Sequence, residues 1–89
     1  MAAGLAEPAF RYSLAAGQEA LRILAAAEAV AHLEKARQLA EEAALEGTEF
    51  SLDMRELFLL LGQAYEMNNQ HGQALAIYDE LLQLGPKLS

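Results

Sequence analysis

Apolar and small side chains recur every three or four residues along the first half of the chain. A first series lies at Phe10, Leu14, Gly17, Leu21 and Leu24, and a second at Ala29, Leu33, Ala36, Ala40 and Ala43. This spacing is the period of an α-helix that buries one face. Glu7 and Pro8 suit the start of the first helix, since proline is tolerated where its missing N–H has no partner.

No strong helix breaker separates these two series. Residues 25–29 read AAAEA, and alanine has the highest helix propensity of all residues. Residues 15–46 are therefore compatible with one continuous helix or with two helices, and periodicity leaves both possibilities open. Gly47 favours an end to helical structure, so residues 47–52 form a predicted loop.

The second half of the chain shows the same period twice more. One helical face carries Met54, Leu57, Phe58, Leu61, Ala64 and Tyr65, and a later one carries Ala74, Tyr78 and Leu81. The NNQHG segment at residues 68–72 predicts a turn between them. Gly85 followed by Pro86 predicts the end of the last helix. The whole pattern predicts an all-α protein of about four helices without strands.

Gly62 lies in the middle of the third predicted helix, where glycine costs about 1 kcal/mol relative to alanine. Phe58, Leu61 and Tyr65 lie on the adjoining rows of the same face. A residue without a Cβ at this place lets a second helix approach closely, with large neighbours filling the flanks. We therefore expect the helix that carries Ala74 and Tyr78 to pack against Gly62.

The spacing of these residues resembles a tetratricopeptide repeat. The elements of the resemblance are Phe58-x-x-Leu61-Gly62-x-x-Tyr65, then Ala74-x-x-x-Tyr78, then Pro86. It covers about residues 55–88, and Leu81 departs from the small residue usual in this family. A weaker copy begins at Gly17, which precedes Ala29 by twelve residues as Gly62 precedes Ala74. This copy places a break between two helices at residues 24–26.

The resemblance implies antiparallel helical hairpins that form a short right-handed superhelix. Residues 1–8 are expected to be disordered or extended, and residues 9–89 to form a single domain. Within it, repeat one spans about residues 10–46 and repeat two about residues 53–88. Residues 25–43 are also similar in composition to the repeat arrays of large bacterial signalling ATPases and transcriptional regulators. A fragment of a larger bacterial regulatory or signalling protein is therefore expected.

Charge and cysteine content narrow the possible partners and compartment. The net charge of −7, with only six Lys and Arg, disfavours nucleic acid, which is bound through basic surfaces, and an anionic membrane surface. The chain has no cysteine, which excludes disulfides and thiolate metal sites and fits a cytoplasmic protein. No apolar run approaches the roughly 18 residues that span a bilayer.

No residue pattern indicates catalysis. His32 and His71 are far apart in sequence and have no carboxylates at a recognised ligand spacing. Adjacent acidic pairs such as Asp79 and Glu80 point about 100° apart on a helix, so they do not form a catalytic dyad. We expect a protein that is not an enzyme and that binds no metal or cofactor.

The resemblance places the functional surface on the first helix of each hairpin, which lines the concave groove in this family. The groove residues implied for this chain are Arg11, Leu14, Gln18, Leu21, Arg22, Glu56, Leu59, Gln63, Glu66 and Met67. Their mixed apolar and polar character favours an extended or helical peptide as ligand. The expected function is thus a non-catalytic protein–protein interaction module.

Leu75 and Leu82 lie seven residues apart on a face next to the one that carries Tyr78. Two repeats are fewer than the three usually needed for a stable array, so this face is expected to contact another chain. A homodimer with a two-fold contact through these leucines follows as a prediction. The alternative function is a purely structural, homodimerising helical bundle, and a sensor that binds a small ligand between its helices is a third reading.

Overall fold

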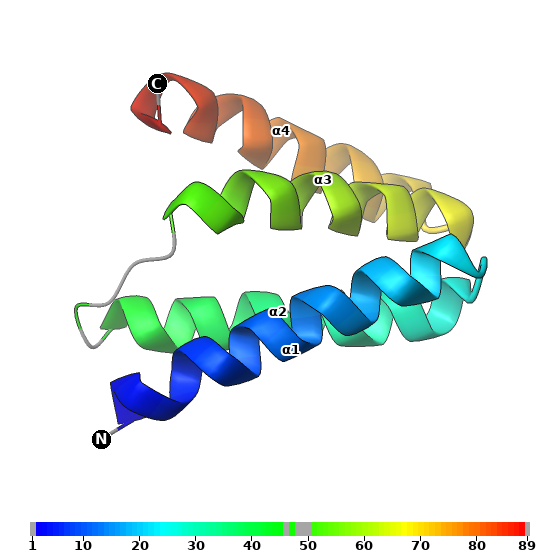
Figure 1. Ribbon diagram of the computed structural model, residues 1–89. Helices are drawn as coiled ribbons and strands as arrows, with labels where there is room; N and C mark the ends of the chain where they lie inside the picture. The colour runs from blue at the N-terminus through cyan, green and yellow to red at the C-terminus, as the bar shows by residue number, and fades with distance from the viewer. Residues whose placement is uncertain (1, 46, 48–50, 89) are drawn as a thin grey trace.

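Four α-helices follow one another along the described part of the chain (Figure 1). The computed structural model describes residues 2–45, 47 and 51–88. The helices are α1 (Ala2–Arg22), α2 (Ala26–Leu45), α3 (Ser51–Met67) and α4 (His71–Leu88). No strand occurs in these residues, so the predicted all-α fold with four helices is confirmed. None of the helices in the described ranges has the length and apolar character needed to cross a bilayer.

A tight turn at residues 23–25 separates α1 from α2, so the alternative of one continuous helix is wrong. The Leu24 N–H donates to the Leu21 carbonyl at 3.0 Å, and the Ala25 N–H donates to the Ala20 carbonyl at 2.8 Å. These two bonds form a Schellman motif, which satisfies the last carbonyl groups of a helix. Leu24 adopts a φ of 63°, the left-handed conformation that the motif requires.

The connection between α3 and α4 repeats this turn 45 residues later in the sequence. The Asn69 N–H donates to the Glu66 carbonyl at 3.1 Å, and the Gln70 N–H donates to the Tyr65 carbonyl at 2.7 Å. Asn69 has a φ of 61°, matching that of Leu24. The two halves of the chain are therefore the same helical hairpin, related by a shift of 45 residues.

The chain reverses direction at each connection, so α1 and α3 run one way and α2 and α4 run the other (Figure 1). α1 packs along α2, and α3 packs along α4. The two hairpins meet mainly through α2 and α3, with a smaller contact between α1 and α3. α2 and α3 are thus the central helices, and α1 and α4 are the outer ones.

The core combines small side chains on α2 with large ones on α1 and α3. Its buried apolar residues are Phe10, Leu14, Ala20, Ala29, Val30, Leu33, Ala36, Ala40, Ala43, Leu57, Phe58, Leu61, Ala64, Tyr65, Ala74 and Ile77. Small residues on one helix opposite large ones on the next allow close interdigitated packing. No buried side-chain nitrogen or oxygen among the described residues lacks a hydrogen-bond partner.

Each hairpin has a glycine in its first helix at the point of closest approach to the second. A Cβ added to Gly62 would lie 2.5 Å from Tyr78 Cζ and 2.9 Å from the Tyr78 hydroxyl oxygen. A Cβ added to Gly17 would lie 2.5 Å from Leu33 Cγ. The expectation that Gly62 admits the helix carrying Tyr78 is confirmed, and Gly17 has the same role in the first hairpin.

The outer helix ends differ from the predictions. α1 begins at Ala2, so the described residues of the segment 1–8 are helical instead of extended or disordered. Pro8 lies inside α1, where it removes one hydrogen bond and crowds the preceding turn, and the alanine-rich residues around it favour helix. α4 likewise continues through Gly85 and Pro86 to Leu88. A glycine before proline lacks the Cβ that normally disfavours helical backbone at that place.

The predicted boundaries of the central loop lie partly outside the described residues. Residues 48–50 of the predicted loop, and residue 46 just before it, lie outside the described residues. α3 begins at Ser51, within the loop predicted for residues 47–52. Gly47 has a φ of 89°, and its N–H donates to the Ala44 carbonyl at 3.1 Å. Gly47 therefore follows the end of α2 in the way expected of a glycine helix stop.

Candidate functional site

The groove residues predicted on α1 divide into exposed and buried members. Arg11, Gln18 and Arg22 are exposed, and Leu21 is partly buried against the core. Leu14 is only 6% exposed and belongs to the core, so its prediction as a groove residue is wrong. Its position in the helical period also fits the core stripe, and the family resemblance alone assigned it to the surface.

All five groove residues predicted on α3 are exposed: Glu56, Leu59, Gln63, Glu66 and Met67. Leu59 is 43% exposed and Met67 is 37% exposed. Glu56, Leu59, Gln63 and Met67 recur at spacings of three and four residues, which places them on one face of α3. This face is polar at its edges and has two apolar side chains within it.

A hydrogen bond joins the predicted surface of α1 to that of α3. The Gln18 side-chain amide donates to the Glu56 carboxylate at 2.6 Å. Both residues are exposed, and they come from the first helix of each hairpin. The tertiary structure therefore brings the two predicted rows of side chains together into one surface, which we call the α1–α3 face. It comprises Arg11, Gln18, Arg22, Glu56, Leu59, Gln63, Glu66 and Met67.

Arg22 lies at one end of this face and forms an ion pair with Glu19. The guanidinium donates from Nε to Glu19 Oε1 at 3.0 Å and also contacts Glu19 Oε2. This pair lowers the pKa of the Glu19 carboxyl and raises the pKa of Arg22, chiefly through the hydrogen bonds between them. Both groups are exposed, where an ion pair adds little stability, so Arg22 stays accessible to a partner.

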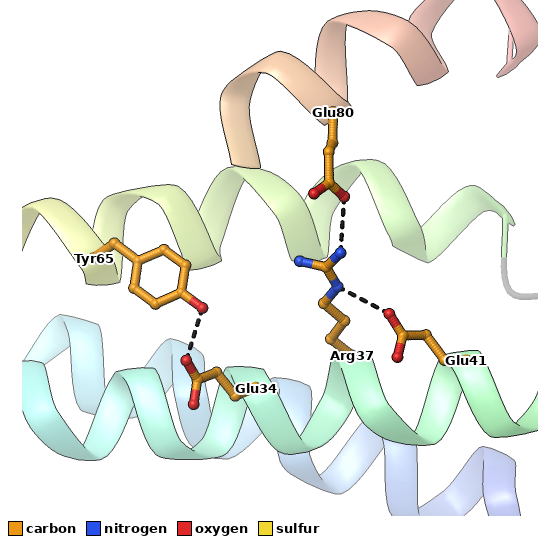
Figure 2. A network of polar contacts seen from close by, with 5 residues as sticks. All are labelled: Glu34, Arg37, Glu41, Tyr65 and Glu80. Carbon is orange, nitrogen blue, oxygen red and sulfur yellow. Dashed lines mark hydrogen bonds and ion pairs between the residues drawn. The ribbon is translucent and has the colours of Figure 1, made fainter. Parts of the chain in front are cut away.

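A second polar cluster, which the sequence did not reveal, lies where α2, α3 and α4 meet (Figure 2). Arg37 on α2 donates from Nη2 to Glu80 Oε1 at 2.8 Å and from Nε to Glu41 Oε2 at 3.2 Å. Its guanidinium also lies 5.3 Å from the centre of the Phe58 ring, a cation–π distance. Arg37 thus links all three helices with one side chain.

Tyr65 joins α3 to α2 beside this cluster. Its hydroxyl donates to Glu34 Oε2 at 2.7 Å. Burial of the ring, followed by the hydrogen bond and the charge of Glu34, raises the pKa of Tyr65 to about 12. Tyr65 lies on the apolar face that the helical period predicted, and the residue is only 7% exposed.

A shallow hollow of about 170 Å³ adjoins the cluster. Its lining residues are Arg37, Tyr65, Gln73, Ala76, Ile77 and Glu80. The polar groups around it already bind one another, because Arg37 is paired with Glu80 and Tyr65 with Glu34. The cluster therefore fastens the hairpins together. The sequence did not reveal the cluster, because no local pattern shows that Tyr65 reaches α2.

The remaining predicted residues lie away from the α1–α3 face. Leu75 and Leu82 on α4 are 71% and 75% exposed, as expected for a face left open to another chain. His32 is partly buried on α2, and His71 is exposed at the start of α4. In the described ranges, no three His, Asp or Glu side chains are grouped so as to hold a metal ion.

The α1–α3 face has the means to bind a peptide through side-chain hydrogen bonds and two apolar contacts. It offers donors at Gln18 and Gln63, a cation at Arg22, and apolar surface at Leu59 and Met67. Comparison of the chain with protein-family models, curated proteins and solved structures finds no match, so inference about function depends on these residues and their geometry.

Proposed function

We propose that this protein is a non-catalytic interaction module of tetratricopeptide-like type, which binds a peptide or helix of a partner protein on the α1–α3 face. The Gln18–Glu56 hydrogen bond carries the proposal, because it unites side chains from two separate hairpins into one surface. The repeated hairpin and the glycines at its closest approach support the family resemblance. A repeated scaffold that presents one row of side chains per unit suits the binding of extended ligands.

The chemistry of the face favours an amphipathic ligand. Leu59 and Met67 supply apolar surface, which gains when an apolar side chain covers it. Gln18 and Gln63 supply amide groups that pair with the peptide backbone or with polar side chains. Arg22 favours an acidic group at one end of the ligand, whereas Glu56 and Glu66 disfavour acidic groups along its length. An amphipathic segment with few acidic residues is therefore the expected ligand.

We also propose a cellular location, a class of partner and a kind of parent protein. A chain without cysteine needs no oxidising compartment to fold, which supports a cytoplasmic location. Six Lys and Arg against thirteen Asp and Glu support a protein partner in preference to nucleic acid. A regulatory or signalling protein of bacterial origin is the expected parent, on the composition of residues 25–43.

The test is selection of binding peptides, followed by titration against variants inside and outside the α1–α3 face. Peptides selected from a displayed library are titrated against the wild-type chain and against the double variant Arg22→Glu/Met67→Glu. Loss of about tenfold or more in affinity is expected, equivalent to about 1.4 kcal/mol. Leu45→Glu is the control, because Leu45 is 88% exposed on α2 and lies outside the face. Equal binding by all three proteins would overturn the proposal.

The competing function is a structural bundle that associates with itself. The exposure of Leu75 and Leu82 on one face of α4 favours it. Self-association and peptide binding use different surfaces of the molecule, so the two functions are compatible. Met67→Glu on α3 separates them, since it should weaken peptide binding and leave self-association through α4 unchanged.

A further inference from the structure

The contact between α2 and α3 is an interface between two copies of one repeated unit. Its polar part consists of the Glu34–Tyr65 hydrogen bond and of Arg37 over the Phe58 ring. Val30 lies one turn before Glu34 on α2 and is only 8% exposed. The second helix of the first hairpin thus covers the first helix of the second hairpin. Because the hairpins are related by a shift of 45 residues, residues of α2 have counterparts on α4, and residues of α3 have counterparts on α1. The exposure of these counterparts shows whether the outer helices carry similar surfaces.

The outer side of α4 carries the counterpart of the α2 surface. A shift of 45 residues places Leu75 at the position of Val30 and Leu82 at the position of Arg37. Val30 is 8% exposed, whereas Leu75 is 71% and Leu82 is 75% exposed. On α3, Leu59 corresponds to Leu14 and is 43% exposed against 6%. In the described residues α4 packs only on α3, so these side chains have no helix over them.

The outer side of α1 carries the counterpart of the α3 surface. Leu57 and Leu61 are fully buried on α3, on the side that adjoins Phe58 and Tyr65. Their counterparts on α1 are Tyr12, which is 73% exposed, and Ala16, which is partly exposed. Ile23 continues this row, one and two turns along from Glu19 and Ala16, and is 54% exposed. In the described residues α1 packs only on α2 and α3, so the side chains on its outer side have no helix over them.

We propose that a second copy of this chain stacks head to tail on the first, with its α1 packed on α4. The contact repeats the α2–α3 interface, so that Tyr12 of one copy meets the surface formed by Leu75 and Leu82 of the other. This arrangement is heterologous, because two different surfaces meet, and each added copy leaves one surface of each kind open. It differs from the two-fold dimer through α4 alone that the sequence suggested.

One residue makes this contact weaker than the α2–α3 interface. Glu19 occupies the position of Ala64, which is fully buried on α3. Stacking therefore brings the Glu19 carboxylate, with its partner Arg22, close to an apolar surface, and removing a charge from water is costly. Association is expected to be reversible and dependent on concentration. Glu19→Ala makes the α1 surface more like that of α3 and should tighten association by about tenfold or more.

Two blocking variants test the arrangement by sedimentation velocity with light scattering. Tyr12→Glu is expected to block contacts through α1 and to leave the α4 surface able to bind. The double variant Leu75→Glu/Leu82→Glu is expected to block contacts through α4 and to leave the α1 surface able to bind. Each variant alone is expected to be a monomer of about the 9.6 kDa chain mass. An equimolar mixture is expected to form a 1:1 complex of twice that mass and no larger species, while the wild-type chain grows further with concentration.

Each result decides for or against head-to-tail stacking. A wild-type chain that stays monomeric up to the highest soluble concentration overturns it. Dimers of Tyr12→Glu alone would show a two-fold contact through α4, and dimers of the leucine double variant alone would show one through α1. A mixture that remains monomeric while the wild type associates also overturns the proposal. Circular dichroism of each variant verifies that the mutated side chains leave the helices intact.

Discussion

Single residues fix how closely the helices of each hairpin approach. Gly62 leaves room for the Tyr78 ring and Gly17 for the Leu33 side chain. Tyr65 and Arg37 then fasten one hairpin to the other with hydrogen bonds and an ion pair. The helix propensity lost at a glycine is therefore offset by contacts that a larger residue would obstruct.

Gly62→Ala is expected to destabilise the protein by about 1–2 kcal/mol. Overpacking here should cost about 2–3 kcal/mol, the upper part of its usual range, because the added Cβ would lie 2.5 Å from Tyr78 Cζ. The gain in helix propensity of about 1 kcal/mol recovers part of this cost. The matched control is Gly72→Ala on α4, where an added Cβ would meet nothing within 4 Å. This control should leave stability unchanged or raise it by up to about 1 kcal/mol. Urea denaturation of both variants is the measurement, and equal effects would contradict the packing argument.

Tyr65→Phe should lower stability at neutral pH by about 1 kcal/mol, because it removes the hydrogen bond to Glu34. The control is Tyr12→Phe, which alters an exposed ring and should change stability by less than about 0.5 kcal/mol. Comparison of the free energies of unfolding from urea titrations at pH 7 provides the test. An equal loss in both variants would show that the Glu34 bond adds nothing.

The pH dependence of stability follows from the raised pKa of Tyr65. The pKa is about 12 in the folded protein and near 10 in the unfolded chain. The unfolded chain therefore loses the phenolic proton first, so stability is fully present below pH 10 and falls as the pH rises towards 12. The raised pKa of Tyr78, also caused mainly by burial, acts in the same direction. Tyr65→Phe should show a shallower decline between pH 9 and pH 11.5 than the wild type.

α1 and α3 end where a backbone turn, more than a side-chain pattern, stops them. The turns after α1 and α3 have the same two hydrogen bonds and the same left-handed residue, at Leu24 and Asn69. Asparagine tolerates this conformation, but leucine is strained in it. The first turn was accordingly harder to recognise from the sequence than the second, because no glycine or asparagine marks it.

Leu24→Gly is expected to stabilise the protein by about 0.5–1 kcal/mol. Leu24 is 75% exposed, so the substitution loses little packing and relieves the positive φ. Asn69→Gly, the same change in the second hairpin, should gain less because asparagine already suits the turn. Thermal and urea denaturation of both variants measure the difference. A larger gain at Asn69 than at Leu24 would contradict the strain argument.

The whole molecule is a short array in which each helix mainly contacts its neighbours in sequence. α2 and α3 are covered on two sides, whereas α1 and α4 each have one side open. The Arg37 cluster lies at the junction of the hairpins, and the α1–α3 face lies on the two first helices. The array thus has one lateral surface, which we propose binds a ligand, and two open end surfaces, which we propose contact further copies.

Head-to-tail stacking is expected to strengthen with salt. Each copy carries a net charge of −7, so copies repel one another at low ionic strength and this repulsion is screened as salt increases. The apparent dissociation constant should fall between about 0.05 M and about 0.5 M NaCl, as measured by sedimentation equilibrium. Weaker association at high salt would indicate that ion pairs, and not apolar contacts of Tyr12, Leu75 and Leu82, hold the copies together.

The sequence predicted some features of the fold and surface correctly and others wrongly. The helical period and the Gly62 spacing predicted four helices and a close α3–α4 contact. The exposure of Leu75 and Leu82 followed from their place in that period. Leu14 was assigned wrongly because the family resemblance placed it in the groove, although its place in the helical period fits the buried stripe.

The sequence by itself determined the central parts of the helices and the apolar face of most of them, because both depend on local spacing and propensity. Only the tertiary structure decided that Gln18 meets Glu56, that Arg37 reaches Glu80, and that Tyr65 binds Glu34. These pairs are separated by more than 30 residues, and their meeting depends on how the hairpins pack. The physical reason is that packing is set by the shapes of whole faces, whereas helix formation is set within a few residues.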